Sequence, residues 1–163
     1  MKFILAMTAM AFALTACNVQ EEDKKDDKDG NTMVNQTDYS ACQPGSGSPS
    51  TPVGLWRMVQ AQGAFTFVKT YNVGTSYLQL THECNFSGTK TSATVGVGTS
   101  VNYGQITIMN DVHNEKAVPQ DGYTLTCRSE LSAGTLRYYF QGGCLVLTDD
   151  NGKNGIMLAP VKQ

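Results

Sequence analysis

The sequence predicts an all-β domain, built as a single antiparallel meander. Two segments, residues 77–86 and 123–131, alternate between apolar and polar side chains with a period of two, which is the pattern of half-buried strands. Short connections that contain Gly or Asn separate the last strands, and no segment of the domain carries a convincing helical stripe. Strands joined by tight turns follow from these three observations.

The remaining strands are expected from apolar and β-branched runs between these signals. The connections at residues 132–134, 141–143 and 149–155 are short and supply Gly or Asn where a tight turn needs a positive φ, so strands that are neighbours in sequence should be neighbours in space. About nine short strands at this spacing are typical of a closed barrel or, as the alternative, a β-sandwich. The further strands are expected at residues 53–60, 64–71, 91–97, 101–110, 135–141, 144–149 and 155–160.

One connection, residues 110–122, is predicted to be the single long loop of the domain, and long loops in compact domains often carry function. It contains Asp111, His113 and Glu115, whose side chains would point the same way in an extended loop and could hold a divalent cation. A plain solvated surface is the expected role of this trio.

The first strand opens with Gly54-Leu55-Trp56. A Gly-x-Trp motif followed by a β-meander resembles the start of a lipocalin-type barrel. The resemblance implies that Trp56 closes one end of the barrel against a basic residue from a late strand, for which Arg128 and Arg137 are the candidates. The family's Thr-Asp-Tyr motif follows its Trp, whereas Thr37-Asp38-Tyr39 precedes Trp56 here, and the domain is shorter than a typical lipocalin. A structural Trp in a β-sandwich is the alternative.

The N-terminus has the order of a secretory signal. Lys2 provides a positive start, and an uncharged apolar run, too short to span a bilayer, extends from Phe3 to Ala16. The following Leu14-Thr15-Ala16-Cys17 resembles the lipobox of bacterial lipoproteins. This resemblance implies cleavage before Cys17, lipidation of its thiol with acyl chains such as palmitate, and, because Asn18 rather than Asp follows, sorting to the outer membrane, on its periplasmic or cell-surface side.

Residues 17–50 are predicted to be the lipidated cysteine and a flexible charged tether, and residues 51–163 the β domain. Residues 18–50 hold three lysines against seven acids and end in a Gly-, Ser- and Pro-rich stretch, a composition that cannot bury a core. Residues 51–163 hold eight basic against seven acidic residues. A near-neutral domain offers no basic stripe, so we expect no nucleic-acid partner.

The cysteine count predicts two disulfides. With Cys17 lipidated, an even set of four remains in an oxidising compartment, for which three connectivities are possible. Cys84 and Cys127 share the inward face of two amphipathic strands, which favours a bridge between them and a second bridge from Cys42 to Cys144.

Catalytic and metal-binding motifs are missing from the sequence. There is no Gly-x-Ser-x-Gly, phosphate-binding Gly loop or His-Glu-x-x-His, and the chain has two histidines. No Cys-x-x-Cys or paired-His spacing occurs, and residues 149–155 lack the spacing and final Glu of a calcium loop. We therefore expect no enzyme activity, no cofactor and no metal.

Candidate ligand contacts come from tyrosines, which combine an apolar ring with a polar tip. Tyr77, Tyr103 and Tyr123, together with Tyr71, could line a cavity mouth. His82 falls on the core face by alternation, where a hydrogen-bonded structural role is expected and a pocket role is the alternative.

The sequence thus predicts a non-catalytic outer-membrane lipoprotein whose β domain binds a small apolar or amphipathic ligand. The alternative is an envelope module that recognises or inhibits another protein through a β surface or through residues 111–120.

Overall fold

The computed structural model describes residues 32–42, 49–120 and 122–161. The expected signal peptide, Cys17 and the charged run after it lie outside these residues. None of the described residues forms a helix that could span a membrane. The strands are β1 (Val34–Asn35), β2 (Gly54–Gln62), β3 (Phe65–Val73), β4 (Tyr77–Phe86), β5 (Thr89–Asn102), β6 (Gln105–Ile108), β7 (Val112–Gln120), β8 (Tyr123–Leu131), β9 (Gly134–Gln141), β10 (Cys144–Thr148) and β11 (Gly155–Pro160).

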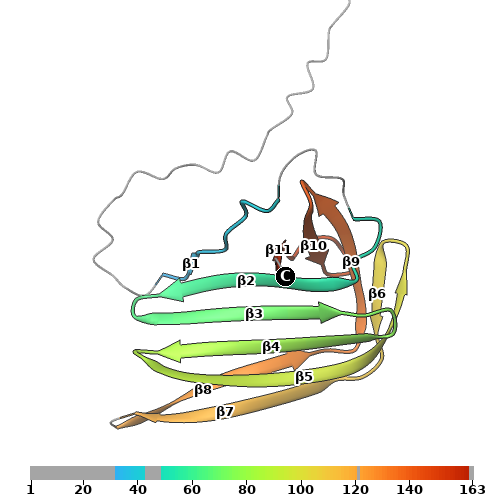
Figure 1. Ribbon diagram of the computed structural model, residues 1–163. Coiled ribbons are helices and arrows are strands. Elements are labelled where there is room, and N and C mark those ends of the chain that lie inside the picture. The colour runs from blue at the N-terminus through green and yellow to red at the C-terminus, as the bar shows by residue number, and fades with distance from the viewer. Residues whose placement is uncertain (1–31, 43–48, 121, 162–163) are drawn as a thin grey trace, which may run out of the picture.

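Eight strands form a closed antiparallel barrel, which confirms the all-β class and the lipocalin-like barrel. They follow one another in the order β2, β11, β10, β9, β6, β5, β4 and β3, and β3 pairs again with β2 to close the ring (Figure 1). The short β1 pairs with the end of β2 that β11 leaves free, at Ala61 and Gln60.

The strands that show clear alternation are confirmed to the residue. β4 and β8 have the expected bounds, and β11 does too. Tight turns occur where Gly was expected to provide them: Gly142 and Gly143, between β9 and β10, have φ values of 57° and 85°.

The expected break between residues 97 and 101 is wrong, because β5 runs through it without interruption. Gly98 is the last residue of β5 that pairs with β4, and Thr99 is the first that pairs with β6. This glycine therefore marks a corner, where one strand passes from one part of the barrel wall to the next, and not a turn. The turn comes later, at Gly104, with a φ of 75°.

The expected long loop at residues 110–122 is also wrong. Residues Val112–Gln120 form β7, which pairs along its whole length with β8 in a two-stranded ribbon separate from the barrel sheet. The segment lacks strict alternation because Pro119 and charged residues occupy it, and such residues are tolerated where a strand edge stays unpaired. The meander is therefore interrupted once, by a hairpin inserted between β6 and β9.

The insertion packs against the long strands of the barrel. β7 and β8 contact β5, and β8 also contacts β4, so the ribbon lies next to these strands in Figure 1. Two apolar clusters result. The larger fills the barrel and includes Leu78, Ile106 and Leu145, while the smaller joins Phe86 of β4 to Val118 of the ribbon.

Because neighbouring strands are antiparallel, the turns divide between two ends of the barrel. The first end carries the β3–β4, β5–β6 and β9–β10 turns. The second end carries the β2–β3, β4–β5 and β10–β11 turns and the inserted β7–β8 hairpin. The two ends differ in what covers them.

The segment before the barrel is attached to its wall. The Thr37 hydroxyl accepts a hydrogen bond from Val59 N (2.8 Å), and the Tyr39 hydroxyl donates one to Met157 O (3.2 Å). A disulfide then joins Cys42 to Cys144 at the start of β10, as the sequence favoured. Residues 32–42 thus lie against β2 and β11.

Candidate functional site

The first end of the barrel is closed by Trp56. Its side chain is 4% exposed, its Nε1 donates to Pro52 O (2.7 Å), and its ring packs at 5.9 Å from that of Phe140 near the β9–β10 turn. The position agrees with what the lipocalin resemblance implies for this Trp. The prediction that Arg128 or Arg137 packs against Trp56 is wrong, because both side chains are about half exposed and form ion pairs with acids elsewhere.

The second end holds a cavity of about 380 Å³ that is open to the surface. Its walls come from the ends of β6, β8 and β10, the starts of β9 and β11, and the inner face of β3, so the inserted hairpin forms one side of it. The apolar part of the lining consists of Tyr71, Ile108, Leu131, Leu136, Leu147 and Ile156. A cavity with this lining can bury an apolar group of small-molecule size.

The polar rim of this cavity carries two carboxylates that already have partners. Glu130 forms an ion pair with Arg128 (3.1 Å). Asp149 accepts hydrogen bonds from Lys153 N (2.9 Å) and Asn154 Nδ2 (2.8 Å) in the β10–β11 turn. The hydrogen bond from the backbone of Lys153 is the main cause that lowers the pKa of Asp149, so this side chain is ionised at neutral pH. The rim acids therefore serve the structure around the cavity.

Tyr71 contributes a buried phenol to this lining. The side chain is 7% exposed, and burial raises its pKa to about 12, so the hydroxyl stays neutral. A neutral phenol among aliphatic side chains is compatible with an apolar ligand.

The hairpin wall is fixed to the barrel by contacts that converge on β4. The predicted disulfide joins Cys84 of β4 to Cys127 of β8. Beside it, Ser129 Oγ donates to Leu80 O (3.0 Å), and His82 Nδ1 lies 2.6 Å from Arg128 O. A carbonyl oxygen can only accept a hydrogen bond, so Nδ1 must carry the proton. In the neutral imidazole of His82, Nε2 is therefore deprotonated.

His82 therefore has the structural role that the sequence favoured, with one unusual feature. Its Nε2 is buried and has no hydrogen-bond partner among the described residues. Burial is the main cause that lowers the pKa of this imidazole, and the positive charge of Lys69 lowers it further. The ring is therefore neutral at neutral pH. Its centroid lies 5.9 Å from that of the Phe67 ring, and the two rings are tilted by 47°.

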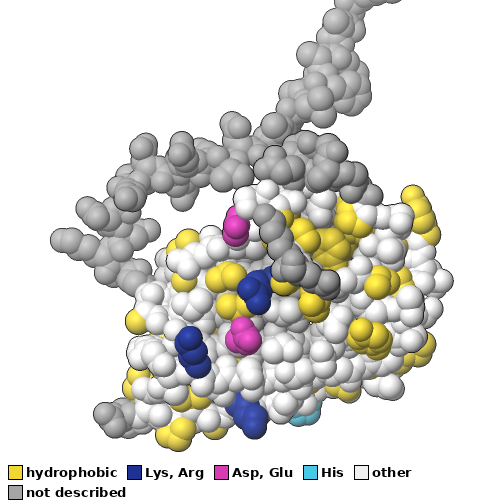
Figure 2. Space-filling model, in the orientation of Figure 1, with side chains coloured by type: hydrophobic (Ala, Val, Ile, Leu, Met, Phe, Trp, Pro, Cys, Tyr) yellow, Lys and Arg dark blue, Asp and Glu magenta, His cyan; other side chains and the backbone are white. Residues whose placement is uncertain are grey.

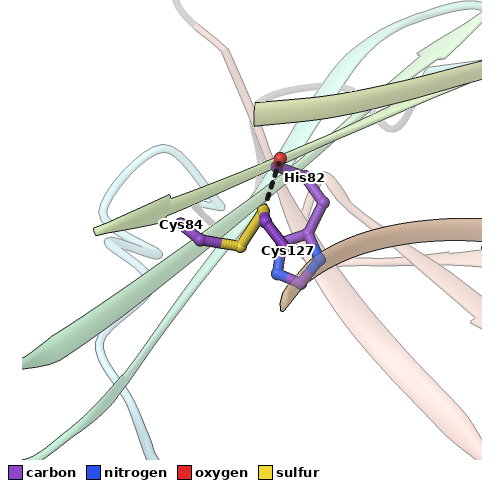
Figure 3. Close-up of side chains that lie close together, drawn as sticks. All are labelled: His82, Cys84 and Cys127. Atoms are coloured by element: carbon purple, nitrogen blue, oxygen red, sulfur yellow. Dashed lines mark hydrogen bonds between the residues drawn. A yellow bond between two sulfur atoms is a disulfide. The ribbon is translucent and has the colours of Figure 1, made fainter. Parts of the chain in front are cut away.

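His82 and the two cysteines of the neighbouring disulfide form the one cluster of potential metal ligands in the described part of the chain. His82, Cys84 and Cys127 have their ligand atoms within 4.8 Å of one another (Figure 3). Both sulfurs are joined in the disulfide, so neither is a thiolate that could bind a metal. For the same reason the 3.3 Å approach of Cys127 Sγ to His82 O, dashed in Figure 3, is a close contact and not a donated hydrogen bond.

The other predicted contacts are dispersed. Tyr77 (47% exposed), Tyr103 (101%) and Tyr123 (57%) stand at the β3–β4, β5–β6 and β7–β8 turns, respectively. The first two turns belong to the closed end and the third to the tip of the hairpin. Among the described residues, the cavity lining includes Tyr71 but not these three or His82.

The trio of Asp111, His113 and Glu115 is exposed, as expected for a solvated surface. Asp111 has a structural task, since its Oδ1 accepts a hydrogen bond from Ala133 N (2.6 Å) and so ties together the two chain segments that enter and leave the hairpin. The turn at residues 149–155 is a hairpin connection, as predicted.

A second hollow, of about 530 Å³, lies on the outer face of β3, β4 and β5 and is lined by polar residues that include Glu83, Asn85 and Lys90. Figure 2 views the layer of β2–β5, where acidic and basic side chains are few and mixed. A polar, mixed surface of this kind has no feature that selects a ligand, so the cavity at the second end is the better candidate site.

Sequence reasoning missed the aliphatic residues that line this cavity. Leu131 was expected on the inward face of its strand, and Leu136, Leu147 and Ile156 fall in strands expected at residues 135–141, 144–149 and 155–160, but none of the four was identified as a ligand contact. The signal that could have separated them is position, since all four lie close to the ends of strands on one side of the barrel.

Comparison of the chain with protein-family models, with curated proteins and with solved structures found no match.

Proposed function

We propose that this protein is a lipid-anchored envelope protein of bacteria whose barrel binds a small apolar or amphipathic ligand without chemical conversion. The observation that carries the ligand-binding part is the asymmetry of the barrel. Trp56 fills one end, whereas the other end contains a cavity of about 380 Å³ whose lining includes six apolar side chains. Pockets for small molecules commonly have volumes of about 300 to 1,000 Å³ and mostly apolar walls.

The cavity supports this proposal through the chemistry of its lining. Six apolar side chains surround it, while its two carboxylates are engaged with neighbouring groups of the protein. Transfer of apolar surface from water into such a site is favourable by about 25 cal/mol per Å². An uncharged apolar group is therefore the part of a ligand that this cavity would hold.

A pair of variants on one strand tests the binding. Leu136 lines the cavity, whereas Tyr139 points outward from the same strand, so Leu136→Trp fills the cavity and Tyr139→Trp leaves it unchanged. We expect the wild-type chain and Tyr139→Trp to bind a neutral naphthylamine fluorophore stoichiometrically and Leu136→Trp to bind it at least tenfold more weakly. Equal binding by all three, or no binding by the wild type, contradicts the proposal.

The anchor rests on the lipobox at Leu14-Thr15-Ala16-Cys17, which lies outside the described residues. Two or three acyl chains give stable membrane attachment because each buried methylene adds about 0.8 kcal/mol. Fourteen residues separate Cys17 from Thr32, the first described residue, and a flexible tether of that length has a root-mean-square span of about 20 Å. The barrel would then stay close to the membrane surface.

The test of the anchor is metabolic labelling with a palmitate analogue. We expect label in the wild-type chain and none in Cys17→Ser, which should also retain its signal peptide. Unchanged labelling of this variant rules out lipidation at Cys17.

Recognition of an envelope protein is the second candidate function, favoured by the unpaired edge of β7. This strand pairs with β8 alone among the described strands, and a free edge can accept a strand from another chain. Capture of one envelope protein that depends on β7, together with no binding of the apolar fluorophore, would favour this second candidate.

A further inference from the structure

The strands of the closed barrel contain four basic residues, and one of them faces inward. Arg57, Lys90 and Arg137 are exposed on the outer face. Lys69 lies in β3, where it shares the inward face with Tyr71 and Val73, both of which are buried. It is itself half-buried, and its cross-strand neighbours are Met58 and His82.

This inward lysine has no acidic partner within the described part of the chain. The ion pairs there are Arg128–Glu130 and Arg137–Asp150. Glu83, the one acid in the barrel strands, is exposed on the outer face of β4. Lysines that lose hydration are normally paired, because partial burial of an uncompensated charge costs free energy. The inner face of β3 therefore presents a cation that lacks a counter-ion.

The neighbouring imidazole does not supply the missing charge. His82 donates its Nδ1 proton to Arg128 O and is neutral at neutral pH, because burial and the nearby ammonium lower its pKa. The positive charge on this part of the inner face thus comes from Lys69. Lys69 is the cross-strand neighbour of His82, so the two side chains lie on the same face of β3 and β4.

Lys69 is not part of the lining of the cavity at the second end, but it lies near that lining along β3. Tyr71, which lines that cavity, is two positions further along the same strand, and residues two apart on a strand are separated by about 7 Å. The lysine stem is long and flexible, so its ammonium can reach a group at the mouth while the stem packs on apolar neighbours.

We propose that Lys69 binds the anionic headgroup of an amphipathic ligand, a carboxylate or phosphate, whose apolar chain occupies the cavity. This inference rests on the proposed ligand-binding function and narrows it to one class. A cationic headgroup would be repelled by Lys69, and a neutral one would leave the ammonium unpaired. The two carboxylates of the rim repel an anion only weakly. Glu130 is already paired with Arg128, and Asp149 already accepts a hydrogen bond within the β10–β11 turn.

The test compares three ligands of equal chain length, namely dodecanoate, dodecanol and dodecylammonium. Binding is measured by displacement of the neutral fluorophore from purified residues 18–163, which include every described residue and lack the lipid-bearing Cys17, in detergent-free buffer at neutral pH. The variant is Lys69→Met, which removes the charge and keeps a similar apolar stem. The matched control is Lys90→Met, which removes an outward-facing lysine from the neighbouring part of the wall. Dodecyl phosphate in place of dodecanoate then separates phosphate from carboxylate recognition.

We expect the wild-type chain to prefer dodecanoate over dodecanol by at least about tenfold and to bind dodecylammonium most weakly. Lys69→Met should lose this preference while binding dodecanol as well as the wild type does, and Lys90→Met should keep it. Unchanged dodecanol binding by Lys69→Met also shows that this variant is folded.

Two results overturn the inference, and they differ in what they say about the proposed function. Equal binding of dodecanoate and dodecanol by the wild type, or a preference that survives in Lys69→Met, rejects the role of Lys69 and leaves apolar binding intact. Absence of binding for all three ligands rejects both the headgroup contact and the proposed function.

Discussion

The disulfide between Cys84 and Cys127 gives the most quantitative prediction. It spans 43 positions of sequence, and the chain-entropy relation for a loop of that size gives about 4 kcal/mol of stabilisation. Both residues are at most 2% exposed, so the double variant Cys84→Ala/Cys127→Ala removes little other than the cross-link. We expect it to lower the free energy of unfolding in urea by about 2 to 4 kcal/mol.

The loss should be accompanied by a local effect on the β7–β8 hairpin. Without the disulfide, the hairpin is attached to the barrel by the small apolar cluster and by hydrogen bonds of Asn114 to Thr94 O (3.0 Å), of Ser129 to Leu80 O (3.0 Å) and of His82 to Arg128 O (2.6 Å). Each such hydrogen bond contributes only about 1 kcal/mol net. Amide hydrogen exchange in β7 and β8 should therefore accelerate more than exchange in β3 and β4.

The matched control is Cys42→Ala/Cys144→Ala, which removes the other cross-link. Its sequence separation of 102 predicts a loss of up to about 4.7 kcal/mol, and the segment released is residues 32–42, not the hairpin. If the hairpin keeps its exchange protection in the first variant, or loses it equally in the control, the disulfide is not what fixes the hairpin wall.

Two further predictions concern Trp56 and His82. Trp56→Ala should lower the free energy of unfolding by about 3 to 5 kcal/mol, because it empties the closed end of the barrel. Trp56→Phe should restore part of this loss. An unchanged urea midpoint for Trp56→Ala would contradict the interpretation that Trp56 closes this end. The folded state lowers the pKa of His82 below 6.5, so the unfolded chain binds more protons and stability should fall as pH drops from about 6.5 through the folded pKa. His82→Asn should flatten this part of a plot of stability against pH, whereas His113→Asn, at the other histidine, should not; equal slopes in both variants would show that His82 is not the source.

The parts of the fold that could be predicted from the sequence are those where local pattern and tertiary burial agree. In β4 and β8 one face is buried and the other is exposed, so period-two alternation marks both strands and their ends. The Cys84–Cys127 pair follows from the same alternation, because two inward cysteines on amphipathic strands can meet only through the core.

The errors have the opposite cause, since they occur where tertiary pairing overrides the local signal. Gly98 falls in the expected break, yet β5 is held on both sides of this glycine by different partners, β4 and β6. Pro119 suggests a loop, yet β7 pairs only on the side facing β8, so a missing N–H on its free edge costs nothing. Neither outcome can be deduced without knowing which strands are neighbours.

The cavity could not be predicted for a related reason. Four of its lining residues, namely Tyr71, Ile108, Leu131 and Leu147, belong to the same apolar cluster as Leu78 and Leu145, so their inward, apolar character does not distinguish them from the rest of the core. Whether an inward residue meets core or cavity depends on how the barrel closes and on where the hairpin lies. Lys69 escaped notice because one lysine among the apolar residues of β3 is compatible with either face until the register of that strand is known.

The position of the insertion also links the hairpin to the proposed ligand. Glu130 and Leu131, at the end of β8, line the cavity, and the residues just before them attach the hairpin to β4. A ligand in the cavity therefore binds the docked hairpin and not a detached one. Since a ligand stabilises the state that it binds by RT ln(1 + [L]/Kd), at one hundred times the Kd it adds about 2.7 kcal/mol to the docked state. The disulfide-free variant Cys84→Ala/Cys127→Ala, in which docking is weakest, is consequently the form in which ligand should restore the exchange protection of β7 and β8 most clearly.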